Sequence, residues 1–546
     1  MASNILGIGQ SALTAAQAGL STTGHNIANA STPGYSRQVV VQDAALPQNF
    51  GFGFLGQGTE VSTVKRIYNE YLGNQVQSAQ TAKSGLDSYY AQIKQIDNLL
   101  ADPASGLSPA LQDFFSGIQE VASNPASIPS RQVALSSAES LASRFHSLAG
   151  RLDEIGQGVN SQVLSSVGAI NSYAEQIANL NDAIGRAQRA TGQPPNDLLD
   201  MRDQLILDLN KEVKATVVKQ GDDGYNVFIG NGQPLVVGGD TFKLSNLTSP
   251  TNPSKIEVAY QTSNGDLVIM ADSGIVGGKL GGLIEFRNKT LEPTQNALGR
   301  VAIGLAITFN GQHDDGYDLD GNLGGPMFSL PSPVVTANSG NAGITADITA
   351  QISDPAALTA SDYRLQFDGT NYTVTRLSDN FTFPPGALPQ TVDGVELDLA
   401  SGAPAAGDSF LIRPTVNGAS GIGVAITDPR LIAAATTTGA VGDNGNALKL
   451  GALQTANIMS GGTSTYQGAY SQIVSQIGNK TRELDVTSSA AGKLLNEATL
   501  SLQNESGVNL DEEATNLLRY QQAYQAAAKV MQIASEMFDT LLTLGR

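Results

Sequence analysis

An apolar seam runs through the stretch from Asn509 to Leu544 and constrains the fold more than any other feature of the sequence. Apolar or aromatic residues recur there at alternating steps of three and four, the spacing of one helix face. They are Leu517, Tyr520, Tyr524, Ala527, Met531, Ala534, Phe538 and Leu541, with Val530, Met537 and Leu544 widening the face. Asn509 suits an N-cap, and the acidic residues 511–513 follow it where the helix dipole favours negative charge. The stretch therefore predicts one unbroken helix.

This seam needs a partner. A helix of that length spans on the order of 50 Å, which is more than a small domain covers. Burying each large side chain stabilises by about 1.5 to 3 kcal/mol, whereas ordering each backbone residue costs about 1 to 2 kcal/mol. One seam alone cannot hold the helix. It is either a core helix docked on its own domain or an assembly helix that becomes ordered when subunits join.

A second, thinner seam lies near the N-terminus. It has the same spacing through Leu6, Gly9, Leu13, Ala16, Leu20, Thr23 and Ile27. Its glycine and threonine content makes it a weak helix by itself. Since its natural complement is the C-terminal seam, we expect the two chain ends to meet. We assign the assembly interface to the larger residues of both seams, which are Leu6, Leu13, Leu20, Ile27, Leu517, Tyr520, Tyr524, Met531, Phe538 and Leu541.

The N-terminal helix is expected to stop in the segment NIANASTPGY, residues 26–35. A proline disfavours helix in the residue before it, so Pro33 should end the helix and form a turn with Gly34. The next segment, RQVVVQ at 37–42, then predicts a strand.

Composition limits the kinds of partner. The 546 residues carry a formal net charge of -19, which argues against nucleic acid and anionic membranes, since both need clustered Lys and Arg. We therefore expect protein partners. The chain has no cysteine and so no disulfide, thiolate nucleophile or Cys-ligated zinc. The N-terminus does not have the pattern of a cleaved signal peptide, and no run of roughly 18 apolar residues occurs.

Between the ends, the apolar period changes from helix to strand and back. Helical spacing at 61–212, 280–312 and 446–504 predicts a rod domain, and residues 1–60 with 505–546 form a terminal assembly domain. Period-two alternation predicts a β domain from 213–279, 313–350 and 416–445, with an outer β domain inserted at 351–415. The predicted fold class is multidomain α+β. Coiled-coil-like terminal and rod domains come from both ends of the chain, with nested antiparallel β domains between them.

Two segments match ligand-binding motifs only in part. Gly51, Gly53 and Gly56 fit G-x-G-x-x-G, but no helix is expected after them, so a flexible turn is the better interpretation. The segment GYDLDGN resembles a calcium loop, yet its first and twelfth positions would be Gly316 and Met327, where carboxylates are needed. We predict no metal or cofactor site.

Candidate catalytic residues are equally few. The three histidines, His25, His146 and His313, fall in different segments, with His313 expected in a turn. None belongs to H-E-x-x-H or to an evident triad. Tyr520 and Tyr524 could flank a ligand, but aromatic residues on a helical seam are typical of packing. We predict no catalytic site.

The motifs at both ends resemble those of the rod, hook and hook-associated axial proteins of bacterial flagella. At the N-terminal end a seamed helix is followed by NIAN and TPGYSR, with motif residues Asn26, Asn29, Thr32, Pro33, Gly34 and Tyr35. The stretch GVNLDEEATNLLRYQQAYQAAAKVMQIASEMFDTLL is similar to the C-terminal end of the hook-associated protein 1 (FlgK) family. The segment LQDFFSGIQEVASNPASIPSRQVALSSAESLASRF resembles that family's helical domain.

The resemblance implies a structural, non-enzymatic subunit that joins hook to filament on the extracellular flagellum. It implies export by the flagellar type III apparatus without a cleaved signal peptide. The implied partners are further copies in a ring or helical lattice, the hook protein, the next junction protein and an export chaperone. The alternative is a secreted adhesin or enzyme that uses axial termini for export and has its activity in the β insertions. Residues 216–445 contain no metal-binding, catalytic-triad or phosphate-binding motif, which argues against the enzyme hypothesis.

Overall fold

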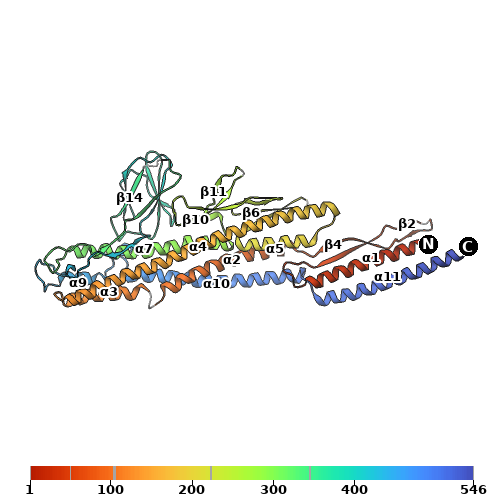
Figure 1. Ribbon diagram of the computed structural model, residues 1–546, viewed down its shortest axis with the longest axis horizontal. Helices are drawn as coiled ribbons and strands as arrows, with labels where there is room; N and C mark the ends of the chain where they lie inside the picture. The colour runs from red at the N-terminus through yellow and green to blue at the C-terminus, as the bar shows by residue number, and fades with distance from the viewer. Residues whose placement is uncertain are drawn as a thin grey trace.

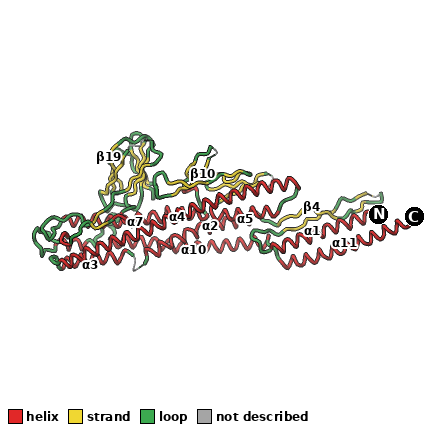
Figure 2. The backbone as a smooth tube through the Cα atoms, viewed as in Figure 1, coloured by secondary structure: helices red, strands yellow, loops and turns green. Residues whose placement is uncertain are grey.

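The protein is a long rod of helices with β structure along one side, as the computed structural model shows (Figure 1). It describes residues 2–49, 51–102, 106–221, 224–262, 264–342 and 346–544. Both chain termini lie at the same end of the rod (Figure 1). In Figure 2 most of the strands lie above the long helices, and the rest form a ribbon along the terminal pair. The predicted α+β fold class is confirmed.

The two ends of the chain form the terminal domain. Helix α1 (Ala2–Asn29) packs on α11 (Leu510–Leu544), and the antiparallel ribbon of β1 (Gln38–Ala44) and β4 (Thr59–Arg66) packs on α1. A small hairpin, β2 (Gln48–Asn49) and β3 (Phe54–Leu55), interrupts the ribbon. Asn509 caps α11 as predicted, since its Oδ1 accepts from the backbone N–H of Asp511 at 3.0 Å.

The rod consists of long helices from several parts of the chain. They are α2 (Glu70–Leu100), α3 (Leu107–Ser123), α4 (Ile128–Thr191), α5 (Asn196–Glu212), α6 (Gly278–Phe286), α7 (Glu292–Asp314), α9 (Gly445–Ala452) and α10 (Tyr466–Ser506). A π-helical turn, η2 (Arg287–Leu291), joins α6 to α7. Helix α4 ends at Gly192, whose φ of 65° suits a glycine C-cap. Phe114, Phe115, Ile118 and Val121 of α3 are buried in the main hydrophobic cluster.

Seven strands lie along α4. A four-stranded sheet contains β5 (Ala215–Gln220), β6 (Gly224–Ile229), β7 (Gln233–Val237) and β8 (Asp240–Thr241). A three-stranded sheet contains β9 (Leu244–Thr248), β10 (Ile256–Gln261) and β11 (Leu267–Ile269), followed by the short helix η1 (Asp272–Gly274). Their buried side chains belong to the same cluster as the rod helices, so this β region is part of the rod's core.

The outer β domain has a hydrophobic cluster of its own. One sheet has the order β13 (Val334–Ala337), β20 (Ser409–Arg413), β15 (Tyr363–Phe367), β16 (Tyr372–Arg376) and β17 (Phe381–Thr382). The other has β14 (Asp347–Ile352), β19 (Val395–Ser401) and β18 (Gln390–Val392). The cluster reaches the rod through Ile303 of α7, which anchors the domain on that helix.

The strand pairing moves one predicted boundary. The outer β insertion was expected to begin at 351, but β13 pairs with β20 and β14 with β19, so the insertion begins before β13. The segments on either side of the insertion, predicted to join the strands at 213–279, do not pair with them either. In these segments β12 (Phe328–Ser329) pairs with β21 (Gly423–Val424). The short helices α8 (Gly418–Gly421) and η3 (Pro429–Leu431) pack on α4. Local periodicity predicts a strand, but pairing depends on residues far away in the chain.

His313 was expected in a turn, and that prediction is wrong. It lies in the last turn of α7 and is fully buried. Its Nδ1–H donates to the carbonyl of Gly325 at 2.7 Å, while Nε2 accepts from the backbone N–H of Ala433 at 2.9 Å. A ring that accepts at one nitrogen must be neutral. Burial also lowers the pKa of His313 below its usual value.

We expect the protein to lose stability in mild acid because of His313. The unfolded imidazole takes up a proton near its ordinary pKa of 6.5, whereas the folded one stays neutral to lower pH. Below pH 6.5 the free energy of unfolding therefore falls by about 1.4 kcal/mol for each pH unit. The fall stops where the folded ring also takes up a proton. Thermal unfolding between about pH 7.5 and about pH 5.5 measures this. His313→Gln should flatten the dependence; an unchanged slope would contradict the assignment.

Candidate assembly interface

Large side chains of α11 fit against glycines of α1. A Cβ added at Gly19 would lie 2.5 Å from the ring of Tyr520, and one added at Gly9 would lie 2.8 Å from Sδ of Met531. Such distances are shorter than van der Waals contact, so only glycine allows the two helices this separation. Glycine lowers the helix propensity of α1 on its own. The same glycines let α1 pack closely against α11.

The helix pair leaves much of the predicted interface open. Tyr520 and Met531 are partly buried against α1, and the centre of the α11 contact is Ala527 and Ala534. Large apolar residues of α11 away from this line are 37% to 58% exposed: Leu517, Leu518, Tyr524, Val530, Ile533, Met537, Phe538 and Leu542. On α1, Leu6, Leu13 and Leu20 are partly buried and Ile27 is exposed. The side chain of Leu541 lies outside the described residues.

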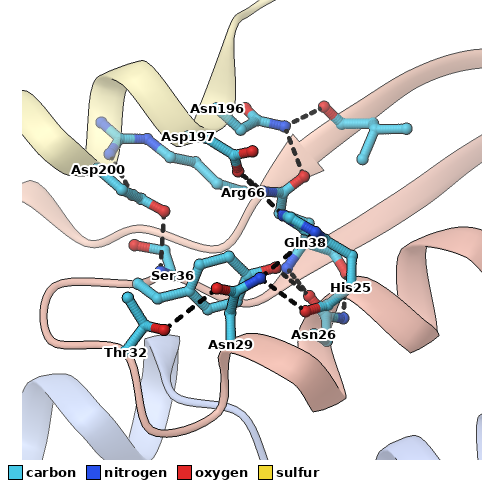
Figure 3. Close-up of polar contacts among 12 residues, drawn as sticks. His25, Asn26, Asn29, Thr32, Ser36, Gln38, Arg66, Asn196, Asp197 and Asp200 are labelled. Atoms are coloured by element: carbon cyan, nitrogen blue, oxygen red, sulfur yellow. Dashed lines mark hydrogen bonds and ion pairs between the residues drawn. The ribbon is translucent and has the colours of Figure 1, made fainter.

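The amide of Asn26 ties together α1, β1 and α11, and Figure 3 shows its contact with Gln38. Its Nδ2 donates to the carbonyl of Gln38 at 2.8 Å and to Oε2 of Glu513 at 3.1 Å. Its Oδ1 accepts from the Tyr35 hydroxyl at 2.7 Å and from the Gln38 N–H at 2.9 Å. Asn26 is almost fully buried, and both its donors and its acceptor are used. Glutamine carries the same groups on a side chain one methylene longer, so this geometry depends on the length of asparagine.

Glu513 extends the same network to an arginine. Its Oε1 accepts from Nε of Arg37 at 2.7 Å, and Nη1 of Arg37 lies 3.0 Å from a carboxylate oxygen of Glu512. The backbone N–H of Arg37 also donates to the carbonyl of Ser506 at 2.8 Å. The start of α11 is thus fixed to the first residues after the motif turn.

The motif turn also docks on the rod, at the start of α5 (Figure 3). The N–H of Ser36 donates to Asp200 Oδ2 at 2.9 Å, and Gln38 Nε2 donates to Asp197 Oδ1 at 2.7 Å. Nη1 of Arg66 lies 2.7 Å from Asp200 and 2.8 Å from Asp203. Burial raises the pKa of the Asp203 carboxyl, while Arg66 opposes the shift. We call this set of contacts the joint.

The remaining motif residues shape the turn. Asn29 accepts a hydrogen bond from the Thr32 hydroxyl at 3.1 Å and donates to the His25 carbonyl at 3.0 Å. Gly34 has a φ of 78°, which favours glycine, and a Cβ there would meet the side chain of Gln204. Burial, with Asp197, Asp200 and Glu513 nearby, raises the pKa of Tyr35, so its hydroxyl stays a donor.

Ring packing and one polar contact place His25 in the joint as well. Its Nε2 lies 3.2 Å from Asp197 Oδ1, and its ring packs edge-on against that of Tyr35 with centroids 5.5 Å apart. His146 lies elsewhere, on α4, where Nε2 donates to the carbonyl of Ile422 at 2.6 Å. The structure therefore does not bring the three histidines together.

The partners of the motif were not identified from the sequence. Arg66, Asn196, Asp200 and Glu513 stand far from residues 26–35 in the chain and follow ordinary helix or strand patterns. Among the described residues, no group of three or more His, Asp or Glu could hold a metal ion. Within the same residues, no helix is long and apolar enough to cross a membrane. What the site offers is packing surface and hydrogen bonds.

Family models match four parts of the chain. A flagella basal body rod protein model matches residues 6–35, and a FlgEFG C-terminal model matches residues 502–544. The helical domain of flagellar hook-associated protein FlgK matches 93–328, and a D2-like domain of flagellar hook-associated protein 1 matches 336–414. The two end matches contain the motif turn and α11.

Whole-chain comparison decides the family. Flagellar hook-associated protein 1 of Salmonella typhimurium is 40% identical, over 99% of this chain and 100% of that protein. The chain belongs to the flagellar hook-associated protein 1 (FlgK) family. The Escherichia coli family member is 38% identical over the same shares. A solved structure, the flagellar hook junction protein FlgK of Burkholderia pseudomallei, matches with a TM-score of 0.74 at 29% identity, covering 79% of this chain and 99% of that one.

Membership in the FlgK family supports a structural role in the flagellum, and not the alternative of an adhesin or enzyme borrowing axial termini. The match to the D2-like domain falls on 336–414, the insertion in which that alternative placed its activity. The family therefore accounts for the outer β domain as well as for the ends.

We expect Gly19→Ala and Gly24→Ala to have opposite effects on the helix pair. Alanine favours helix over glycine by about 1 kcal/mol, and a Cβ at Gly24 meets nothing within 4 Å. At Gly19 the methyl group would overlap Tyr520, and overpacking costs about 1 to 3 kcal/mol. Hydrogen exchange of α1 amides in the full-length protein measures both. Equal protection in the two variants would contradict the close packing.

Proposed function

We propose that this chain joins the flagellar hook to the filament as a structural subunit without catalytic activity. Its partners are further copies of itself, the hook protein and the next junction protein. The observation that supports this most directly is the uncovered apolar surface of α11. Six large apolar residues that recur along this one helix are 37% to 46% exposed. Such a surface is typical of protein interfaces.

The arrangement of residues around α11 indicates where neighbours bind. Exposed polar residues follow helical spacing on the side away from α1: Gln522, Gln525, Lys529, Gln532 and Glu536. The exposed apolar residues lie between this polar stripe and the α1 contact, on both flanks. A neighbouring subunit on each flank would cover the apolar residues and leave the stripe in water. This pattern supports a closed ring or a helical lattice, in which each subunit has two neighbours.

The proposal includes the route by which the chain reaches the flagellum. We infer export through the flagellar type III apparatus, without a cleaved signal peptide and with a chaperone that covers the apolar face of α11 beforehand. Support comes from an N-terminus whose seam residues belong to the folded α1–α11 pair. A chain without cysteine also forms no wrong disulfide on the way out.

We expect Leu517→Asp to abolish the junction while leaving the subunit folded. Leu517 is 37% exposed, so a carboxylate there stays hydrated in the monomer but is desolvated once a neighbour covers the flank. Removal of residues 537–546 should act in the same way. Cells should then have hooks without filaments and release flagellin into the medium, as electron microscopy and immunoblots would show.

Gln525→Asp on the polar stripe of the same helix is the matched control, and it should keep filaments. Circular dichroism of the purified variants checks that both fold. Normal filaments on cells that carry only Leu517→Asp would contradict the proposed function.

A further inference from the structure

The β2–β3 hairpin presents large apolar side chains to solvent at the far end of the terminal domain. Leu46 is 88% exposed and Phe54 is 73% exposed. The hairpin is attached to the start of α1, where the N–H of Thr59 donates to Oγ of Ser11 at 3.3 Å. In Figure 1, β2 lies beside the N-terminal end of α1. An exposed apolar projection of this kind marks an interaction site.

The hairpin is also uncharged. The segment LPQNFGFGFLGQG at 46–58 contains no Asp, Glu, Lys or Arg, in a chain whose formal net charge is -19. Two copies of so acidic a chain repel each other over most of their surfaces. Contact through the hairpin avoids that repulsion, which favours a second copy as its partner.

A groove at the joint offers a partly apolar surface. It has a volume of 410 Å³, and its lining combines the apolar groups of Pro33, Tyr35, Met201 and Leu205 with the carboxylates of Asp197 and Asp200. Met201 is 56% exposed, although it projects from a helix of the rod. Gln176 and Gln204 lie on the rim, where they can bond to backbone groups of an inserted loop. The volume lies in the range of sites that take a few apolar groups.

The hairpin cannot reach the groove of its own chain. It is attached at Ser11, whereas the groove begins at His25, about 20 Å further along α1 at about 1.5 Å per residue. Figure 1 shows β2 beside the N-terminal end of α1, and α5, which carries Met201 and Leu205, beyond the other end of α1. Any hairpin in the groove therefore comes from another chain.

We propose that the β2–β3 hairpin of one subunit docks in the joint groove of another copy, with Phe54 against Met201. The inference rests on the proposed function, because it requires assembled subunits. The contact is heterologous, and its two halves lie at different heights along the molecule. Copies joined in this way are offset along the axis by the distance between the hairpin and the groove.

Disulfide trapping tests the contact, because the chain has no cysteine of its own. Phe54→Cys and Met201→Cys are combined in one chain, and junctions are isolated from flagellated cells and oxidised. The expected result is a ladder of linked chains. The control combines Phe54→Cys with Leu448→Cys, since Leu448 is 58% exposed but lies on α9. It should give no ladder. Filaments without links from the first pair, or equal ladders from both, overturn the contact.

A charge exchange tests the contact without cysteine chemistry. Phe54→Glu, which would face Asp197 and Asp200, should reduce the fraction of cells with filaments at least tenfold, and adding Met201→Lys should restore most of it. Normal filaments from Phe54→Glu, or loss without restoration by Met201→Lys, overturn the docking. If the docking fails but Leu517→Asp abolishes filaments in the same strain, the proposed function still holds. Normal filaments from Leu517→Asp would instead contradict the function itself.

Discussion

The packing of α1 against α11 brings the first and last helices of the chain together. The arrangement of the other domains depends on this contact. Because the first and last helices pair, all intervening structure must leave from and return to the same end of the rod (Figure 1). The contact depends on Gly9 and Gly19, which let Met531 and Tyr520 approach the α1 backbone. It buries only a narrow line of α11. The pair therefore holds the ends together and still leaves apolar surface for assembly.

The joint connects the paired ends to the rod through hydrogen bonds and ion pairs. Among the described residues, neither hydrophobic cluster includes any part of α1 or α11. What fixes the terminal domain is the amide of Asn26, the Arg37–Glu513 pair and the Arg66 contacts with α5. Hydrogen bonds have strict geometry, whereas apolar packing allows sliding. The joint therefore sets the direction in which the exposed flanks of α11 face.

Periodicity in the sequence predicted the elements well, and pairing between them poorly. The helix that ends at Leu544 and its cap at Asn509 both follow from local patterns. The strands of the outer β domain were recognised, but β13 and β14 were assigned to the wrong module because register partners lie far apart. Similarly, His313 looked like a turn residue because its partners, Gly325 and Ala433, come from later segments. The motif around Asn26 was identified, but its role in the joint was not. Whether the predicted interface residues contact neighbouring subunits stays a prediction.

The most direct test of assembly through α11 is binding of the purified protein to isolated hooks, observed by electron microscopy. If the uncovered flanks of α11 attach the subunit, full-length protein should form a cap at the distal end of each hook. A chain that ends before α11 should leave hooks bare at the same concentration. Capping by the shortened chain, or bare hooks with full-length protein, would contradict the account.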